Sequence, residues 1–195
     1  MALQNKKIGI IGTGNMGESL IDGIISFMKI NPNDLYASDI DNSKLNAIKS
    51  KYKINTLSNS NLLDSVNIII LAVKPQQIDY VLKEIQAHEQ SYDLVISIAA
   101  GIETAYIEKT IQKKTPVIRV MPNICATVNN AVSALSRGKF ADENTFEIAK
   151  RLFESIGLVV EVEEQLMDVV TGLSGSTKLT LILSTVYTKS LSVSG

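Results

Sequence analysis

The sequence predicts an α/β fold in which a doubly wound, mostly parallel sheet is covered by helices on both faces. Two observations support this fold class. Short runs rich in valine and isoleucine alternate along the chain with segments whose apolar residues recur at helical spacing. One run, Asn67–Val73, is almost continuously apolar, as expected for a strand in the middle of a parallel sheet. Such alternation is typical of right-handed strand–helix–strand crossovers.

In the first half of the chain, each expected strand leads into an expected helix. Lys6–Ile11 is the first strand. A helix with one buried stripe follows it, marked by Leu20, Ile21, Ile24, Ile25 and Met28. The same reasoning gives the strands Leu35–Ser38, Ile54–Leu57 and Asn67–Val73 and the helices Ser43–Tyr52, Asn61–Ser65 and Gln77–His88.

The second half continues the alternation and then stops it. We expect strands at Leu94–Ile98, Val117–Met121, Val132–Leu135 and Val159–Val162, with helices at Glu103–Ile111 and Glu143–Ser155. From about Glu164 only a helical pattern, Gln165–Leu173, remains. We therefore place a domain boundary there, with a dinucleotide-binding domain at residues 1–163 and the beginning of a helical domain at 164–195.

Composition excludes several classes of protein. The chain of 195 residues carries 19 Lys and Arg against 20 Asp and Glu, and this balance argues against a nucleic-acid partner. No apolar run approaches the ~20 residues that span a bilayer, and the N-terminus lacks the pattern of a signal peptide. The single cysteine, Cys125, excludes an intrachain disulfide. We expect a cytoplasmic protein without a membrane or nucleic-acid partner.

A glycine motif joins the first strand to the first helix, at Gly12-Thr13-Gly14-Asn15-Met16-Gly17. In a Rossmann-type domain, the first glycine allows a tight turn and the second lets the backbone approach a pyrophosphate. The third lets the helix pack close to the strand, and the helix N-terminus offers free N–H groups to the phosphates. The alternative is a glycine-rich turn without a ligand. The strand–turn–helix context favours a bound dinucleotide.

Asp39 ends the second strand, at the spacing of about 20 residues where a carboxylate accepts the ribose hydroxyls of adenosine. This favours NADH, since a 2′-phosphate would be repelled unless a cation compensates. Ser38 could donate to such a phosphate, and Lys44 could reach one. The alternative is that Asp39 only caps the turn before Ser43.

Four further segments combine with the glycine motif into a family pattern. They are Ala72-Val73-Lys74-Pro75-Gln76, Ser97-Ile98-Ala99-Ala100-Gly101, Arg119-Val120-Met121-Pro122-Asn123 and the stretch from Met167 to Ser176. In order and spacing they resemble the pyrroline-5-carboxylate reductase family over about residues 5–176. The first three follow expected strands, where ligands bind in open α/β sheets.

The resemblance implies further cofactor contacts. Backbone groups of Ala72, Val73, Lys74 and Pro75 would face the cofactor, and the family residue that matches Asn59 contacts the adenosine side. Asn123 could bind the nicotinamide or the substrate, or could instead form an Asx-turn after Pro122. Lys74 could equally be a solvated loop lysine.

No side chain is assigned a catalytic role. Cys125 is more typical of a small buried hydrophobe, and His88 suits the C-terminal end of its helix as a cation. With one Cys and one His, no nitrogen- or sulfur-rich metal site is predicted.

The resemblance implies reduction of 1-pyrroline-5-carboxylate to L-proline by NADPH or NADH. In the family, an all-helical C-terminal domain supplies a threonine near the imine nitrogen and a glycine-rich loop for the carboxylate, and it also dimerises. After Ser176 the family usually continues Gly-Pro-Ala-Tyr, whereas this chain has Thr177-Lys178-Leu179-Thr180. We therefore expect an incomplete helical domain, impaired activity of this chain, and a dimerisation that is left open.

Three interpretations follow. The first is a reductase whose recorded chain is truncated or altered at its C-terminus. The second is a dinucleotide-binding protein without catalysis, which serves as a sensor or is a relic. The third is another imine or β-hydroxyacid reductase with the same fold, and the combination of the Ala72–Gln76 and Arg119–Asn123 motifs argues against it.

Overall fold

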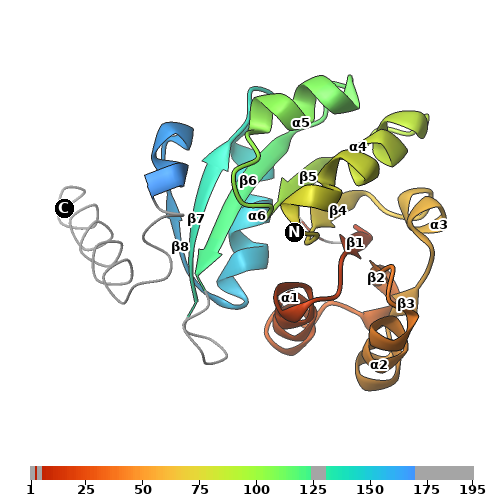
Figure 1. Ribbon diagram of the computed structural model, residues 1–195. Helices are drawn as coiled ribbons and strands as arrows, with labels where there is room; N and C mark the ends of the chain where they lie inside the picture. The colour runs from red at the N-terminus through yellow and green to blue at the C-terminus, as the bar shows by residue number, and fades with distance from the viewer. Residues whose placement is uncertain (1–2, 4–5, 124–130, 170–195) are drawn as a thin grey trace.

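The computed structural model describes residues 3, 6–123 and 131–169 (Figure 1). Within these residues the strands are β1 (Ile8–Ile11), β2 (Leu35–Ser38), β3 (Asn55–Thr56), β4 (Ile68–Leu71), β5 (Leu94–Ser97), β6 (Val117–Asn123), β7 (Ala131–Arg137) and β8 (Gly157–Glu161). The α-helices are α1 (Asn15–Ser26), α2 (Asn42–Tyr52), α3 (Asn59–Leu63), α4 (Ile78–Ala87), α5 (Thr104–Ile111) and α6 (Glu143–Glu154). Three short 3₁₀ helices are η1 (Pro32–Asp34), η2 (Pro75–Gln77) and η3 (Glu164–Leu166).

One eight-stranded sheet organises the described residues, in the order β3-β2-β1-β4-β5-β6-β7-β8. The first six strands run parallel, with β1 paired to β2 on one side and to β4 on the other. The chain thus reverses its direction of strand addition between β1 and β4, which is where doubly wound sheets bind their ligands. This confirms the predicted fold class. β7 departs from the parallel pattern, because it pairs antiparallel with β6.

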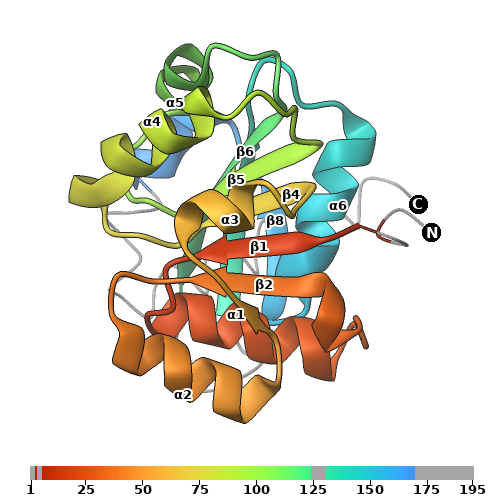
Figure 2. The same cartoon turned by 90° about the vertical axis from the view of Figure 1, so that its right-hand side faces the viewer.

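Helices cover both faces of this sheet (Figure 2). One buried cluster joins the strands to α1, α2 and α6, and a second joins them to α3, α4 and α5. The four residues of β4 are completely buried, as the apolar run there predicts for a strand covered on both faces. The predicted stripe of α4 is also confirmed, since Ile78, Val81, Leu82 and Ile85 are all buried.

Polar side chains mark where several helices begin. Asp41 caps α2 by accepting from the backbone N–H groups of Ser43 and Lys44. Asp142 and Thr145 form a capping box at α6. Ser58 caps α3, which therefore begins at Asn59, earlier than the Asn61 that apolar periodicity predicts. This correction places Asn59 in the first turn of a helix.

The last described turn is joined to the sheet through one buried arginine. Arg119, on β6, is only 3% exposed and lies 2.8 Å from Asp168 and 3.7 Å from Glu164. Glu164 also accepts hydrogen bonds from the backbone N–H and the hydroxyl of Thr104 at the start of α5. Three elements distant in sequence are joined in this way.

Part of the predicted C-terminal region lies outside the described residues. The expected helix Gln165–Leu173 is represented by η3 and a helical turn at residues 167–169. Cys125 lies outside the described residues. So do the part of the expected helical domain after residue 169 and the segment Thr177-Lys178-Leu179-Thr180. Among the described residues, no helix is long and apolar enough to span a membrane.

Candidate functional site

A cleft opens where β1, β2 and β4 end, at the reversal of strand order. Its volume is about 490 Å³, within the range of small-molecule sites. Seven of the predicted cofactor-binding residues line it, namely Gly12, Gly14, Asp39, Asn59, Ala72, Val73 and Lys74, and so does Lys44, which the sequence analysis considered as a phosphate contact. Segments distant in sequence thus meet at one site, as the predicted topology requires.

Two glycines of the motif are required by the protein's own packing. Gly12 has a φ of +101°, and a Cβ there would lie 2.5 Å from the carbonyl oxygen of Ala72. At Gly17, a Cβ would lie 2.1 Å from the carbonyl oxygen of Gly12. These contacts match the roles predicted for a tight turn and for close approach of the helix.

Gly14 is different, because nothing in the protein crowds it. A Cβ there would meet no atom within 4 Å, and its φ of −67° is open to any residue. Yet Gly14 lines the cleft. The backbone at Gly14 thus borders open space in the cleft.

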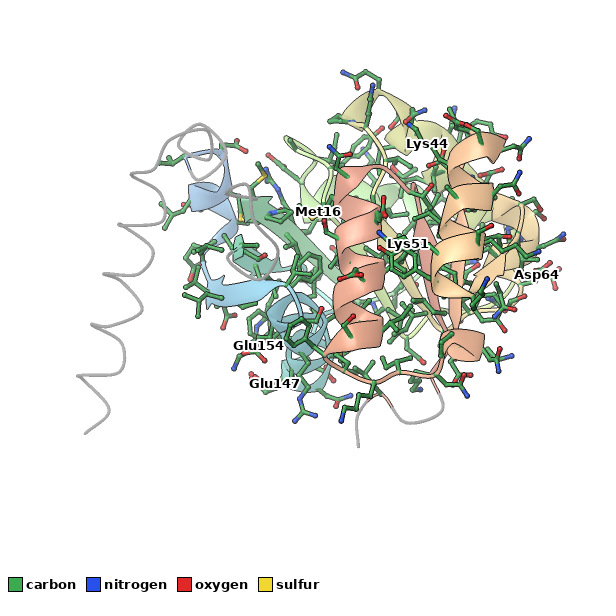
Figure 3. The ribbon with its side chains drawn as sticks, turned by 90° about the horizontal axis from the view of Figure 1, so that it is seen from below. Met16, Lys44, Lys51, Asp64, Glu147 and Glu154 are labelled. Atoms are coloured by element: carbon green, nitrogen blue, oxygen red, sulfur yellow. The ribbon has the colours of Figure 1, made fainter. Side chains whose placement is uncertain are left out.

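The same loop leads directly into the N-terminus of α1. Gly14 is its N-cap residue, and no side chain caps it, so the first-turn N–H groups have no side-chain acceptor there. Figure 3 shows α1 and α2 side by side, with Met16 and Lys44 near their N-terminal ends. Thr13, Asn15, Met16 and Gly17 belong to the loop and first turn but are not among the residues that line the cleft.

The carboxylate of Asp39 is already hydrogen-bonded to the glycine loop. One oxygen accepts from the backbone N–H of Thr13 at 2.6 Å and from its hydroxyl at 2.8 Å, and the other accepts from the N–H of Asp41 at 2.9 Å. Partial burial by itself would raise the pKa of Asp39. The hydrogen bonds from Asp41 and Thr13 outweigh burial and hold that pKa below its ordinary value. Asp39 therefore stays ionised and joins the loop to the end of β2.

Ser38 lies beneath the cleft and does not line it. Its side chain is 1% exposed, and its hydroxyl has no hydrogen-bond partner among the described residues. Its carbonyl oxygen accepts from the N–H of Gly12. The hydroxyl is therefore not placed to donate to a phosphate, and the residue's visible contribution is its backbone contact with the loop.

The segment after β4 supports the cleft from the other side. The N–H of Ala72 donates to the carbonyl oxygen of Ile11 at 2.8 Å, which extends the pairing of β1 and β4 to the edge of the cleft. Lys74 is exposed and precedes η2, which begins at Pro75. Pro75 itself is not among the lining residues.

Sequence reasoning missed two apolar side chains at this site. Ile40 is 82% exposed and Tyr80 is 66% exposed, and both line the cleft. Apolar side chains so exposed at a cleft are suited to cover the flat face of a ligand. Tyr80 could have been found from the sequence, because it lies off the buried stripe of α4. Asp41, Gln76 and Gln77 also line the cleft.

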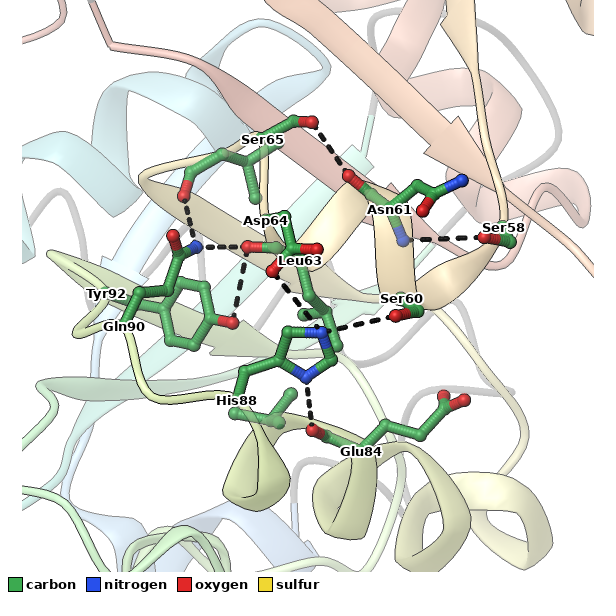
Figure 4. Close-up of polar contacts among 12 residues, drawn as sticks. Ser58, Ser60, Asn61, Leu63, Asp64, Ser65, Glu84, His88, Gln90 and Tyr92 are labelled. Atoms are coloured by element: carbon green, nitrogen blue, oxygen red, sulfur yellow. Dashed lines mark hydrogen bonds and ion pairs between the residues drawn. The ribbon is translucent and has the colours of Figure 1, made fainter.

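Two further residues that the sequence analysis discussed lie at the ends of elements. Asn123 is the last residue of β6, which extends beyond the predicted Met121, and its side chain is outside the described set. His88 follows α4, where its Nδ1 lies 2.7 Å from the carbonyl oxygen of Glu84, as expected for a residue at a helix C-terminus (Figure 4). Its Nε2 faces Ser60 and Asp64 of the neighbouring segment. The described residues hold no cluster of His, Cys, Asp or Glu suited to a metal ion.

Comparison with known proteins places the cleft in a family context. Residues 7–101 match the model of a family described as NADP oxidoreductase, coenzyme F420-dependent. The chain is 41% identical to a pyrroline-5-carboxylate reductase of Methanosarcina acetivorans, covering 89% of this chain and 65% of that one. It is 34% identical to the one of Corynebacterium melassecola, covering 91% and 67%.

Solved structures agree with these relatives. A pyrroline-5-carboxylate reductase of Coxiella burnetii superposes with a TM-score of 0.82 at 30% identity, covering 91% of this chain and 67% of the other. A pyrroline carboxylate reductase of Plasmodium falciparum with NADP bound gives 0.77 at 28% identity, covering 92% and 66%. The chain spans 65% of the Methanosarcina relative and 58% of a Bacillus subtilis relative.

Proposed function

Because the chain belongs to the pyrroline-5-carboxylate reductase family, we propose that it catalyses the reduction of 1-pyrroline-5-carboxylate to L-proline with NADH or NADPH. The observation that carries the proposal is Gly14. Neither its backbone angles nor its packing require a glycine, yet it faces a cleft at the point where strand order reverses. A ligand that approaches this backbone closely explains the residue.

The cleft residues fit a nicotinamide dinucleotide. The loop from Gly12 to Gly17 and the uncapped start of α1 would hold the pyrophosphate. Asp39, Asn59, Ile40 and Tyr80 would surround the adenosine. The backbone of Ala72–Pro75 would face the nicotinamide end of the cofactor. Asn123 would contact the substrate.

The chemistry asks little of the protein's side chains. When bound, the dinucleotide supplies a hydride to the carbon of the protonated imine, and the electron pair of the double bond then remains on the nitrogen as the amine forms. The protein's part is to hold the two partners in line and to exclude water. No general acid or metal is needed for that step.

The wider assignment belongs to the same proposal. We assign residues 1–163 to the dinucleotide-binding domain and residues 164–195 to the beginning of an incomplete helical domain, the part that in the family supplies the substrate side. A cytoplasmic setting, as the sequence patterns predict, belongs to the same proposal, whereas dimerisation is implied only for the family's complete helical domain.

The test has two stages. The purified chain is titrated with NADH and with NADPH by nicotinamide fluorescence, and proline formation from pyrroline-5-carboxylate is then measured with each cofactor. Binding followed by stoichiometric proline formation supports the proposal. Binding without turnover would make the protein a non-catalytic dinucleotide binder, and absence of binding would overturn the assignment altogether.

A further inference from the structure

Glu84 lies behind the adenosine end of the cleft and reaches across to another helix. From α4, its Oε2 accepts a hydrogen bond from Nδ2 of Asn59 at 2.6 Å. Asn59 is the first residue of α3 and lines the cleft, whereas Glu84 does not. The short distance identifies a charge-assisted hydrogen bond.

The same carboxylate also acts on Tyr80, one helical turn earlier on α4. The pKa of Tyr80 is raised, first by the negative charge of Glu84 and then by a hydrogen bond between the two side chains. One partly buried carboxylate is therefore hydrogen-bonded to one cleft side chain, Asn59 on α3, and influences the charge state of a second, Tyr80 on α4.

This contact fixes the orientation of the Asn59 amide. An ionised carboxylate can only accept hydrogen bonds, so the amide nitrogen must lie on the Glu84 side. The carbonyl oxygen Oδ1 therefore lies on the side of the amide group away from Glu84. None of the described residues donates a hydrogen bond to it. Asn59 is thereby held as an acceptor for whatever occupies the cleft.

The charges near this end of the cleft also favour a ribose hydroxyl over a 2′-phosphate. Asp39 and Asp41 line this end of the cleft with their carboxylates, and Lys44 is the neighbouring cation, with its Nζ 3.9 Å from Asp41. A ribose hydroxyl can donate to Oδ1 of Asn59. A fully ionised 2′-phosphate cannot donate, and it would meet the carboxylates of Asp39 and Asp41.

We propose that Glu84 is a positioning residue for cofactor choice: by holding the Asn59 amide, it makes the adenosine end of the cleft favour a ribose hydroxyl over a 2′-phosphate. This inference rests on the proposed function. It concerns which dinucleotide is preferred, not whether one binds.

The experiment compares dissociation constants for NADH and NADPH in the full chain by fluorescence titration. Glu84→Gln keeps the shape of the side chain but removes the charge and adds a donor, so that the Asn59 amide can turn. We expect the ratio of the NADPH constant to the NADH constant to fall about fivefold or more. Glu89→Gln is the matched control, because Glu89 is an exposed carboxylate just past the end of α4 and outside the cleft.

A double-mutant comparison separates positioning from the charge itself. In an Asn59→Ala background, Glu84→Gln should leave the ratio unchanged, because the residue through which it acts is gone. The proposal is overturned if Glu84→Gln changes both constants equally, if Glu89→Gln shifts the ratio as much, or if the shift persists without Asn59. If the parent chain binds neither dinucleotide, the proposed function itself fails.

Discussion

Among single residues, the glycines of the loop show how the same residue type can serve the fold or the ligand. Gly12 and Gly17 lie against backbone atoms of the protein, so the fold leaves no room for a side chain at either position. Gly14 has open space above it. Substitutions at these positions should therefore separate stability from binding.

We predict that Gly14→Ala folds normally and binds NADH at least tenfold more weakly, because its methyl group occupies space that a ligand needs. Gly17→Ala should instead lower the free energy of unfolding by about 1–3 kcal/mol, since its Cβ would overlap the carbonyl oxygen of Gly12. Urea unfolding and fluorescence titration of both variants measure the two effects. Equal NADH affinity in Gly14→Ala and the parent chain would contradict the assignment of this position.

Asp39 provides a prediction about pH. Its pKa is lowered in the folded state, so the ionised form adds stability above the unfolded-state pKa of about 3.9. That contribution is lost as the pH falls through the lower, folded-state pKa. The stability difference between the parent chain and Asp39→Asn should thus be present at pH 7 and shrink below about pH 4. Urea midpoints measured at a series of pH values test this, and a constant difference would contradict it.

At the level of elements, local patterns predicted strands and helices well because burial follows periodicity. Ile78, Val81, Leu82 and Ile85 show a helical stripe in the sequence and are buried in α4. The start of α3 was missed, because it depends on one capping hydroxyl, that of Ser58, rather than on a repeated pattern.

Contacts between distant residues could not be predicted in the same way. The glycine motif identified the loop, yet nothing local to Asp39 indicated that its carboxylate would bind Thr13. The pairing of Asn59 with Glu84 likewise depends on two helices meeting side by side. Such contacts are properties of the assembled fold, and only weak signals for them exist in a single sequence.

The attachment of η3 to the sheet gives a prediction at this scale. Removing the carboxylate in Glu164→Ala leaves the N–H and hydroxyl of Thr104 without their acceptor and takes one partner from the buried Arg119. Because Asp168 still pairs with Arg119, we expect a loss of about 1–3 kcal/mol in the free energy of unfolding. Glu163→Ala, an exposed neighbour whose side chain makes no cap contact, is the control and should change stability little. Equal stabilities of the two variants would exclude this role for Glu164.

For the whole molecule, ligand binding and stability should be linked. A dinucleotide that binds only the folded chain stabilises it by about 2.7 kcal/mol at a hundred times its dissociation constant. For a chain of this size, that corresponds to a rise in Tm of about 5–10 °C. Thermal unfolding with and without NADH measures the rise, and Gly14→Ala should reduce it to about half or less, because a tenfold weaker affinity leaves about 1.4 kcal/mol of stabilisation at the same NADH concentration. A rise of the same size in that variant would mean that NADH binds elsewhere.

The position of β1 inside the sheet has a consequence for synthesis on the ribosome. Among the described strands, β1 is synthesised first, yet its two neighbours are β2 and β4, and the walls of the cleft reach as far as Tyr80 and Val81. Until β4 has emerged, one edge of an isoleucine-rich strand is unpaired and open to other nascent chains. The early nascent chain therefore exposes an aggregation-prone edge, and slow translation before β4 should lower the yield of folded molecules.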